Sequence, residues 1–186
     1  TIPAGVASAD GGTTSQTDNG IDVFCVGNLT RVGRLRGLGA GERIYSMRFA
    51  GDVGYMVTFR QIDPLYTVSL AAPTEPRVLG ELKIPGYSDY LHPIDTSTLL
   101  GIGQAGDDDG RLRGVKIALF DISDQTAPIE KGAIELGGPQ SSTLVSNDHK
   151  ALLFDPKRSL LVLPITERVD WSCDPPSFHG AKVFTL

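Results

Sequence analysis

Two of the three histidines, His92 and His149, are candidates for acid–base chemistry. His92 precedes Pro93, and His149 follows Asp148. A hydrolase would need His92, Asp148 and His149 within hydrogen-bond reach of one another, with a serine nucleophile close by. No Gly-x-Ser-x-Gly motif marks such a serine, and no two histidines stand at metal-site spacing. We therefore expect Asp148 and His149 to hydrogen-bond neighbouring backbones, with the hydrolase as the alternative.

The acidic run 106–110 is the stretch that could hold a hard cation. Alternating carboxylates followed by glycine resemble the start of a calcium loop, which would place Asp107 and Asp109 at its third and fifth positions. The first and twelfth positions then fall on Ala105 and Lys116, which cannot act as carboxylate ligands. We expect this run to form an acidic hairpin turn that binds no cofactor. The alternative is a calcium ion bound by Asp107 and Asp109.

Arg60 and Trp171 are candidate binding residues. Arg60 lies among apolar residues, and a buried arginine needs a carboxylate such as Asp63 or Glu42. It forms either a structural ion pair between neighbouring sheets or a ligand contact. Trp171, the single tryptophan, lies in a loop and either contacts a partner or covers the base of that loop.

Two cysteines stand far apart in the chain. Cys25 falls on an expected strand, and Cys173 lies in the same loop as the tryptophan. A disulfide between them would suit an extracytoplasmic protein. Two free thiols, with Cys25 buried, are the alternative.

Composition excludes several classes of protein. The chain has 186 residues, and 17 basic against 22 acidic residues give a net charge of −5. Nucleic-acid binders usually carry a basic patch, so no nucleic-acid partner is expected. No apolar run approaches the ~20 residues of a membrane-spanning helix. The 22 glycines and 12 prolines favour a turn-rich fold of one domain.

The elements that position these residues are expected to be strands. Residues 1–20 are small and polar, which is typical of a linker or loop. From residue 21 onward, short alternating apolar runs are separated by turn residues, and no helical stripe is present. We expect strands at about 55–60, 66–70, 79–84, 99–103, 115–122 and 159–164. The chain begins with Thr and stops within a strand-like stretch, so we expect a piece of a longer protein.

An internal repeat organises residues 21–186. Residues 63–86 align with 115–138 at an offset of 52, with matching Pro76/Pro128 and Gly80/Gly132. A looser copy lies at 22–38, and a fourth begins at residue 181. Periods of ~40–50 residues are typical of β-propeller blades, which must stack because one sheet cannot bury both of its faces. The all-β fold is therefore expected to be an incomplete propeller of about three to four blades, with a β-sandwich as the alternative.

Several local runs resemble one known family. The relevant stretches are Gly41–Phe49, Val57–Gln61, Leu79–Gly86, Tyr90–Pro93, Leu99–Gly103, Leu119–Asp124, Asp148–Ala151 and Leu153–Pro156. They resemble the secreted bacterial and archaeal C-terminal β-propeller family, which is distantly related to WD repeats. The resemblance covers roughly residues 20–186. The chain departs from the family's repeat at Ser69, where the family often has Asp. The matching position in the next repeat, Asp121, has the family's residue.

The resemblance implies an extracytoplasmic protein, and the family supplies no reaction. We accordingly expect this chain to be a non-catalytic module of a bacterial envelope protein and to bind a protein or a glycan. The remaining blades of the propeller are expected elsewhere in the parent chain. Its candidate binding residues are Arg60, His92, Asp148, His149 and Trp171.

Overall fold

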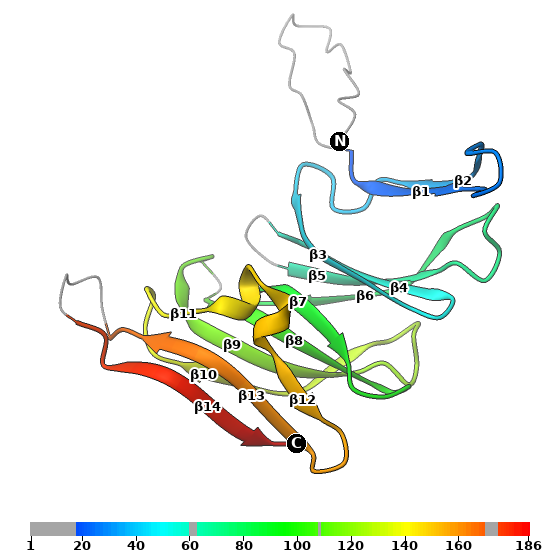
Figure 1. Cartoon of the computed structure of the whole chain (residues 1–186). Helices are drawn as coiled ribbons and strands as arrows, with labels where there is room; N and C mark the ends of the chain where they lie inside the picture. Colours follow the sequence, from blue (N-terminus) through cyan, green and yellow to red (C-terminus); the bar gives the residue numbers. More distant parts are fainter. Residues whose placement is uncertain (1–17, 60–62, 108, 170–174) are drawn as a thin grey trace, which may run out of the picture.

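The computed structural model describes residues 18–59, 63–107, 109–169 and 175–186, and its regular structure is almost entirely β-strand. The strands form four sheets, and all pairs within them are antiparallel. Figure 1 shows the sheets stacked in chain order, from β1 and β2 at the top to β11–β14 at the lower left. The predicted all-β fold is confirmed.

The first three sheets are simple meanders. The first pairs β1 (Gly20–Phe24) with β2 (Arg31–Arg36). The second contains, in order, β3 (Arg43–Ala50), β4 (Val53–Phe59), β5 (Asp63–Ser69) and β6 (Arg77–Ile84). The third contains β7 (Tyr87–Pro93), β8 (Thr98–Gly106), β9 (Leu112–Asp121) and β10 (Ile129–Leu136).

The fourth sheet has a divided first strand. Its members are β11 (Ser142–Thr143), β12 (Leu153–Asp155), β13 (Leu160–Glu167) and β14 (Phe178–Thr185). Both β11 and β12 pair with β13, and two short 3₁₀ turns separate them, η1 (Leu144–Ser146) and η2 (His149–Ala151). Within the part of the chain that the structure describes, no helix has the length and apolar character needed to cross a bilayer.

The sequence repeat corresponds to the outer half of each sheet. The copy at 63–86 contains β5 and β6, and the copy at 115–138 contains most of β9 and all of β10. The looser copy is β1 with β2, and the fourth copy begins within β14. Because the same unit recurs in consecutive stacked sheets, each sheet is one blade of a repeat. The architecture is that of a partial β-propeller.

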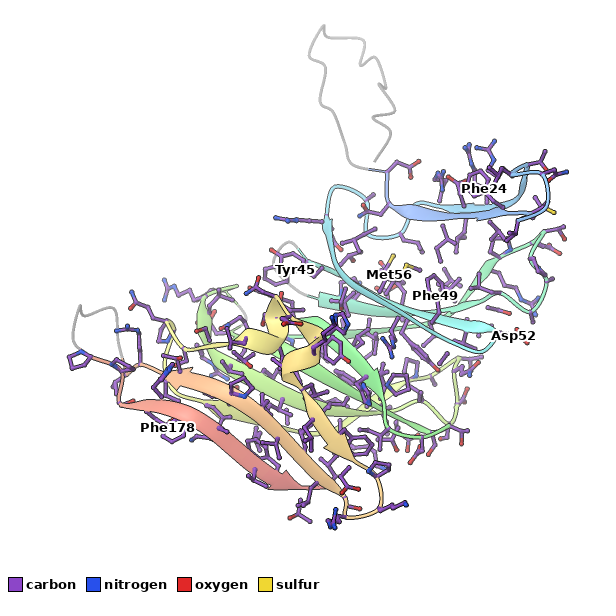
Figure 2. The ribbon with its side chains drawn as sticks, viewed as in Figure 1. Phe24, Tyr45, Phe49, Asp52, Met56 and Phe178 are labelled. Carbon is purple, nitrogen blue, oxygen red and sulfur yellow. The ribbon has the colours of Figure 1, made fainter. Side chains whose placement is uncertain are left out.

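Apolar layers between the blades form the core. Side chains alternate along a strand, so neighbouring residues of β4 face opposite blades. Met56 faces β1 and β2, where it packs with Ile21. Figure 2 shows Met56 between its own sheet and the sheet of β1 and β2. Tyr55 instead packs with Leu99 and Phe120 of the next blade.

The next interface repeats this arrangement one blade further on. It is formed by Leu100, Ile102, Ile117, Val145, Leu161, Leu163 and Ile165. Full burial of one such side chain stabilises the fold by roughly 1.5–3 kcal/mol. Strands β4 and β8 are therefore buried along nearly their whole length, because each lies between two neighbouring blades.

Close backbone contact also holds the blades together. The turn between β9 and β10 rests on Gly80 of β6, where an added Cβ would lie 2.6 Å from the Thr126 carbonyl oxygen and 2.7 Å from that of Gln125. The hydroxyl of Thr67, opposite Gly80 in the sheet, donates to the Gln125 carbonyl at 2.5 Å. Glycine is required at position 80 because the turn occupies the space of a side chain.

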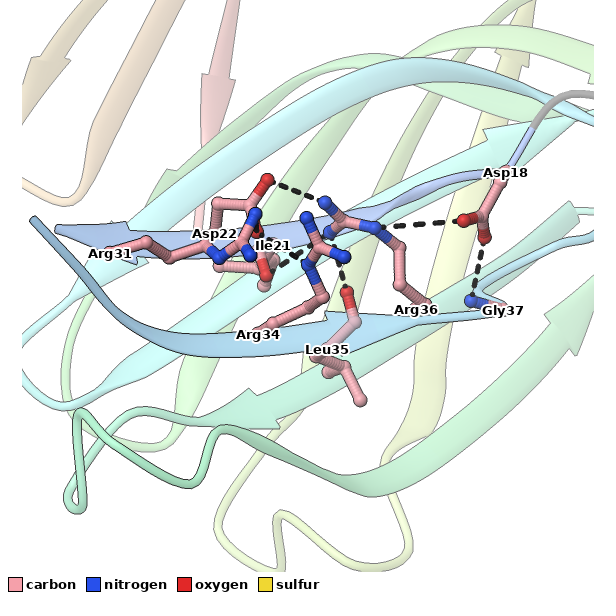
Figure 3. A network of polar contacts seen from close by, with 8 residues as sticks. All are labelled: Asp18, Ile21, Asp22, Arg31, Arg34, Leu35, Arg36 and Gly37. Carbon is pink, nitrogen blue, oxygen red and sulfur yellow. Dashed lines mark hydrogen bonds and ion pairs between the residues drawn. The ribbon is translucent and has the colours of Figure 1, made fainter. Parts of the chain in front are cut away.

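The outward face of the first sheet carries charges (Figure 3). Asp22 accepts hydrogen bonds from Arg34 at 3.1 Å and from Arg36 at 2.5 Å, while Arg31 lies 3.9 Å away. Arg36 also forms an ion pair with Asp18 at 3.6 Å. The hydrogen bond from Arg36 is the largest cause that lowers the pKa of Asp22 below 3.8. Desolvation opposes it, and the hydrogen bond from Arg34 lowers the pKa further.

We predict that Gly80→Ala lowers the free energy of unfolding by about 1–3 kcal/mol, because the turn above it must move. Chemical denaturation would measure the change. Gly132→Ala is the matched control, since a Cβ there meets no heavy atom of the described residues within 4 Å. Equal effects of the two substitutions would contradict the proposed contact.

We also predict that Asp22→Asn lowers the melting temperature most at low salt, because three arginines then lose their shared carboxylate and surface charges are screened by ions. Since the pKa of Asp22 is lowered, the stabilisation is present above about pH 3.8 and is lost as the pH falls through the lowered value. Glu75→Gln on an exposed turn is the control. A salt-independent effect of Asp22→Asn would refute this account.

Candidate functional site

The first strands of successive blades lie side by side and form the inner wall of the propeller. Strand β7 lies next to β3, and η1 lies next to β7. Each of β3 and β7 contains one extra residue relative to its partner strand, which leaves Tyr45 and Asp89 as bulges. In the fourth sheet, the insertion 144–152 separates β11 from β12 at the corresponding place.

The insertion 144–152 is fixed by two side-chain caps. Thr143 accepts a hydrogen bond from the Val145 amide at 3.3 Å and donates to the Pro164 carbonyl at 2.7 Å. Asp148 accepts a hydrogen bond from the Lys150 amide at 3.0 Å, which caps η2. Val145 is buried in the layer between the third and fourth blades. The insertion is therefore anchored to the core and follows the inner wall.

A polar and aromatic group lies on β7 beside this insertion. The Tyr90 hydroxyl is 3.1 Å from Nδ1 of His92, and the rings of His92 and Phe154 form a T-shaped pair with centroids 5.6 Å apart. Burial lowers the pKa of His92 below 6.5, and the positive charge of Arg48 on β3 lowers it further. His92 is consequently neutral at pH 7. When Tyr90 donates to Nδ1, the ring carries its proton on Nε2 and can donate to a ligand.

Asp89 provides a carboxylate on the same wall. It is partly buried, and desolvation raises its pKa above 3.8. The Ser146 hydroxyl of the insertion comes close enough to offset part of this shift, although its geometry falls short of a hydrogen bond. Asp89 and Ser146 therefore form a contact between β7 and η1 in which the carboxylate is poorly compensated.

The structure places His92, Asp148 and His149 on neighbouring inner elements but does not join them. His92 contacts Tyr90 and Phe154, whereas Asp148 is used by the η2 cap and His149 is exposed. No hydrogen bond links the three residues within the described ranges. The Asp148 side chain bonds only to the amide two residues further along its own turn among the described residues, so the expected bonds of Asp148 and His149 to neighbouring backbones stay a prediction. The hydrolase arrangement would require His149 to move toward His92.

The remaining candidates are distributed over other parts of the chain. Arg60, Trp171 and Cys173 lie outside the described residues. Asp107 accepts hydrogen bonds from the amides of Asp109 and Arg111, at 3.0 and 2.8 Å, and so closes the hairpin between β8 and β9. No cluster of three or more metal-ligating side chains occurs among the described residues. The expectation of no cofactor stays a prediction.

Both ends of β1 differ slightly from the sequence-based expectations. Cys25 is exposed in the turn after β1, not buried on a strand, because β1 ends at Phe24. At the other end, β1 begins at Gly20, and the buried Asn19 side chain donates to the carbonyls of Gly39 and Glu42 at 3.0 and 2.9 Å.

Sequence reasoning missed Asp89, Tyr90, Arg48 and an aromatic cluster. In that cluster Tyr45, Phe59 and Tyr87 have ring centroids 4.4–5.7 Å apart, so it joins the inner strands of two blades. A tyrosine stands near the start of the first strand in two blades, as Tyr45 and Tyr87, and this recurrence could have pointed to the aromatic cluster. Asp89 offered none, because its environment depends on the insertion from the following blade.

We predict that Asp89→Asn raises the melting temperature at pH 7, because the uncharged amide avoids the desolvation of the carboxylate. The gain should shrink as the pH falls from the raised pKa of Asp89 toward 3.8, since the wild-type folded state then binds the extra proton and is itself stabilised. Thermal unfolding between pH 3 and 8 measures this, with Asp52→Asn on an exposed turn as control. A loss of stability at pH 7 would show that the Asp89 charge is compensated.

The chain is similar to two archaeal proteins. The chain is 47% identical over 136 residues to an uncharacterized protein of Archaeoglobus fulgidus, which covers 73% of the chain and 21% of that protein. It is 48% identical over 137 residues to an uncharacterized protein of Methanocaldococcus jannaschii, which covers 74% of the chain and 21% of that protein. The chain thus spans about a fifth of the length of these relatives. Both organisms are archaea, and a bacterial origin stays a prediction.

The family of β-propeller domains matches residues 5–186. This match includes every strand described above, and the stacked four-stranded sheets have the expected form. The chain belongs to the β-propeller domain family.

Proposed function

We propose that this chain forms part of a non-catalytic β-propeller of an extracytoplasmic protein, and that it binds a protein or a glycan of the cell envelope. The observation that carries the proposal is the group of Tyr90, His92 and Phe154 on the inner wall, with Arg48 beside it. Aromatic side chains and arginine supply much of the binding energy at recognition surfaces.

The arrangement of this group suits binding to a neutral or anionic polar ligand. His92 is neutral at pH 7 and partly buried, so it can offer a directed hydrogen bond without the cost of desolvating a charge. Phe154 belongs to a different blade from His92, and the relative position of the two rings is held by the apolar layer below them. A surface built across two blades is rigid before a ligand arrives, which reduces the entropic cost of binding.

The wider context of the parent protein belongs to the same proposal. We propose that the remaining blades are supplied by the parent protein, and that the ring they complete is exposed outside the cytoplasm. The length of the archaeal relatives supports further blades. The extracytoplasmic location is supported by the resemblance of the local runs to secreted propellers, and fractionation of cells that express the parent protein would test it.

We predict that His92→Ala weakens binding to a panel of immobilised envelope polysaccharides and glycopeptides by about tenfold or more, because it removes both a hydrogen bond and a ring contact. Surface plasmon resonance of the 186-residue chain measures the effect. His179→Ala is the matched control, since His179 is exposed on β14 and pairs with Thr166 at 2.9 Å, away from the inner wall.

The competing outcomes are distinguishable. Binding that survives His92→Ala unchanged would move the binding surface elsewhere on the chain. Hydrolysis of any panel member that disappears in both His92→Ala and His149→Ala, while the melting temperature is unchanged, would establish the hydrolase instead.

A further inference from the structure

A polar cleft lies at the junction of the second and third blades, on their outer strands. It has a volume of about 420 Å³. Its lining includes Pro85 of the link from β6 to β7, Gly106 at the end of β8, and charged side chains of β9 and β10. The cleft is bounded by two complete four-stranded sheets.

Four charged side chains form a row of alternating sign in this cleft. Nζ of Lys116 lies 2.7 Å from Oε2 of Glu130. Glu135 is the partner of Lys116 across the β9–β10 ladder, which brings the two side chains within reach of each other, and it forms an ion pair with Arg113. Asp107 also lines the cleft, but its carboxylate already accepts hydrogen bonds from two backbone amides.

The inner pair of this row is buried and poorly hydrogen-bonded. Lys116 is 8% exposed, and among the described residues its ammonium makes one long hydrogen bond, to the Pro85 carbonyl at 3.4 Å. Oε2 of Glu130 is buried, and the geometry of its ion pair with Lys116 falls short of a hydrogen bond. Buried charges without good hydrogen bonds cost stability. Both groups can therefore still accept a partner from a ligand.

The repeat does not require this pair. At the offset of 52, Lys116 and Glu130 correspond to Pro64 and Val78, which have the same register in β5 and β6. The second blade thus forms the same pair of strands without these charges. Since apolar residues often replace a buried ion pair at no cost in stability, folding alone does not explain why the third blade has one.

We propose that this cleft binds the α-ammonium and α-carboxylate groups of a free amino acid. The carboxylate of the ligand accepts hydrogen bonds from Lys116 and Arg113, and its ammonium donates to Glu130 and Glu135. Charge-assisted hydrogen bonds of this kind are the strongest that a protein offers to a small ligand. A zwitterion matches the row because its two opposite charges are also adjacent.

Other small ligands complement the cleft less well. A simple amine leaves Lys116 without an acceptor, and a simple carboxylate leaves Glu130 without a donor. A sugar diol can donate and accept, but it carries no charge to offset the desolvation of both groups. The small residues Gly106 and Ala133 in the lining leave space for a short side chain, so glycine and L-alanine are the probes of choice.

Nuclear magnetic resonance titrations of the 186-residue chain, labelled with ¹⁵N, test the proposal. L-alanine should shift the amide signals of Lys116, Ala133 and Glu135 saturably, and it should bind about tenfold more tightly than propionate or ethylamine. The proposal is wrong if neither glycine nor L-alanine shifts these signals, or if a ligand with one charge binds as tightly. Tighter binding of methyl glucoside at the same amides would assign the cleft to sugars and overturn the proposal.

A double variant separates ligand binding from folding. Lys116→Met with Glu130→Met should abolish the shifts caused by L-alanine without lowering the melting temperature, because an apolar pair replaces a buried ion pair. Lys182→Met with Glu167→Met is the matched control, since it removes a Lys–Glu pair at 2.6 Å on the fourth blade. This control should bind L-alanine as the wild type does. Unchanged binding by the first double variant would refute the proposal.

Arg113→Gln gives a second test that does not disturb the core. Arg113 is exposed at the mouth of the cleft, so the substitution should leave the melting temperature unchanged and weaken L-alanine binding by about threefold or more. Equal affinity of this variant and the wild type would overturn the proposed arrangement. These residues are not those of the inner wall, so failure here leaves the binding proposal around His92 unaffected.

Discussion

The structure depends on one constraint, which is that the central strands β4 and β8 carry apolar side chains on both faces and are buried on both. In β4, Met56 and Tyr55 point to opposite neighbours, and in β8 the pair Leu99 and Leu100 does the same. Such a strand cannot be stable at the surface of a single sheet, because half of its side chains would remain in water. The blades must therefore stack, and the stacking order of the chain follows from which face of each blade meets which neighbour.

This constraint explains why most strands beyond the first of each blade were predictable. The strands expected at about 55–60, 66–70, 79–84, 99–103, 115–122 and 159–164 correspond to β4, β5, β6, β8, β9 and β13. Glycine and proline recur at matching places of the outer pairs, as Gly80 and Gly132 do, and this recurrence made the pairs recognisable. Strand ends differ by a few residues because capping and bulges depend on contacts that local patterns do not contain.

The inner strands were harder to predict because they do not share one geometry. A single bulged residue, Tyr45 or Asp89, interrupts two of them, whereas the insertion 144–152 divides the third. His92 could be chosen from its residue type, but its contacts with Tyr90 and Phe154 arise only when two blades stack. Asp148 and His149 follow from a local motif, and the use of Asp148 as a cap depends on the 3₁₀ turn. The candidate site lies where the repeat departs from regularity.

The contact between a turn and a glycine also gives the stack a polarity. The second blade offers Gly80 on one face and its turn 70–76 on the other, so neighbouring blades contribute different surfaces to their interface. In the language of symmetry, the interface is heterologous, and it cannot be made by two identical faces related by a twofold axis. Units joined by heterologous contacts form a closed ring when the rotation between them brings the last unit into contact with the first. Otherwise the series of units continues as an open helix. The rotation between neighbouring blades therefore determines how many of them can close a ring.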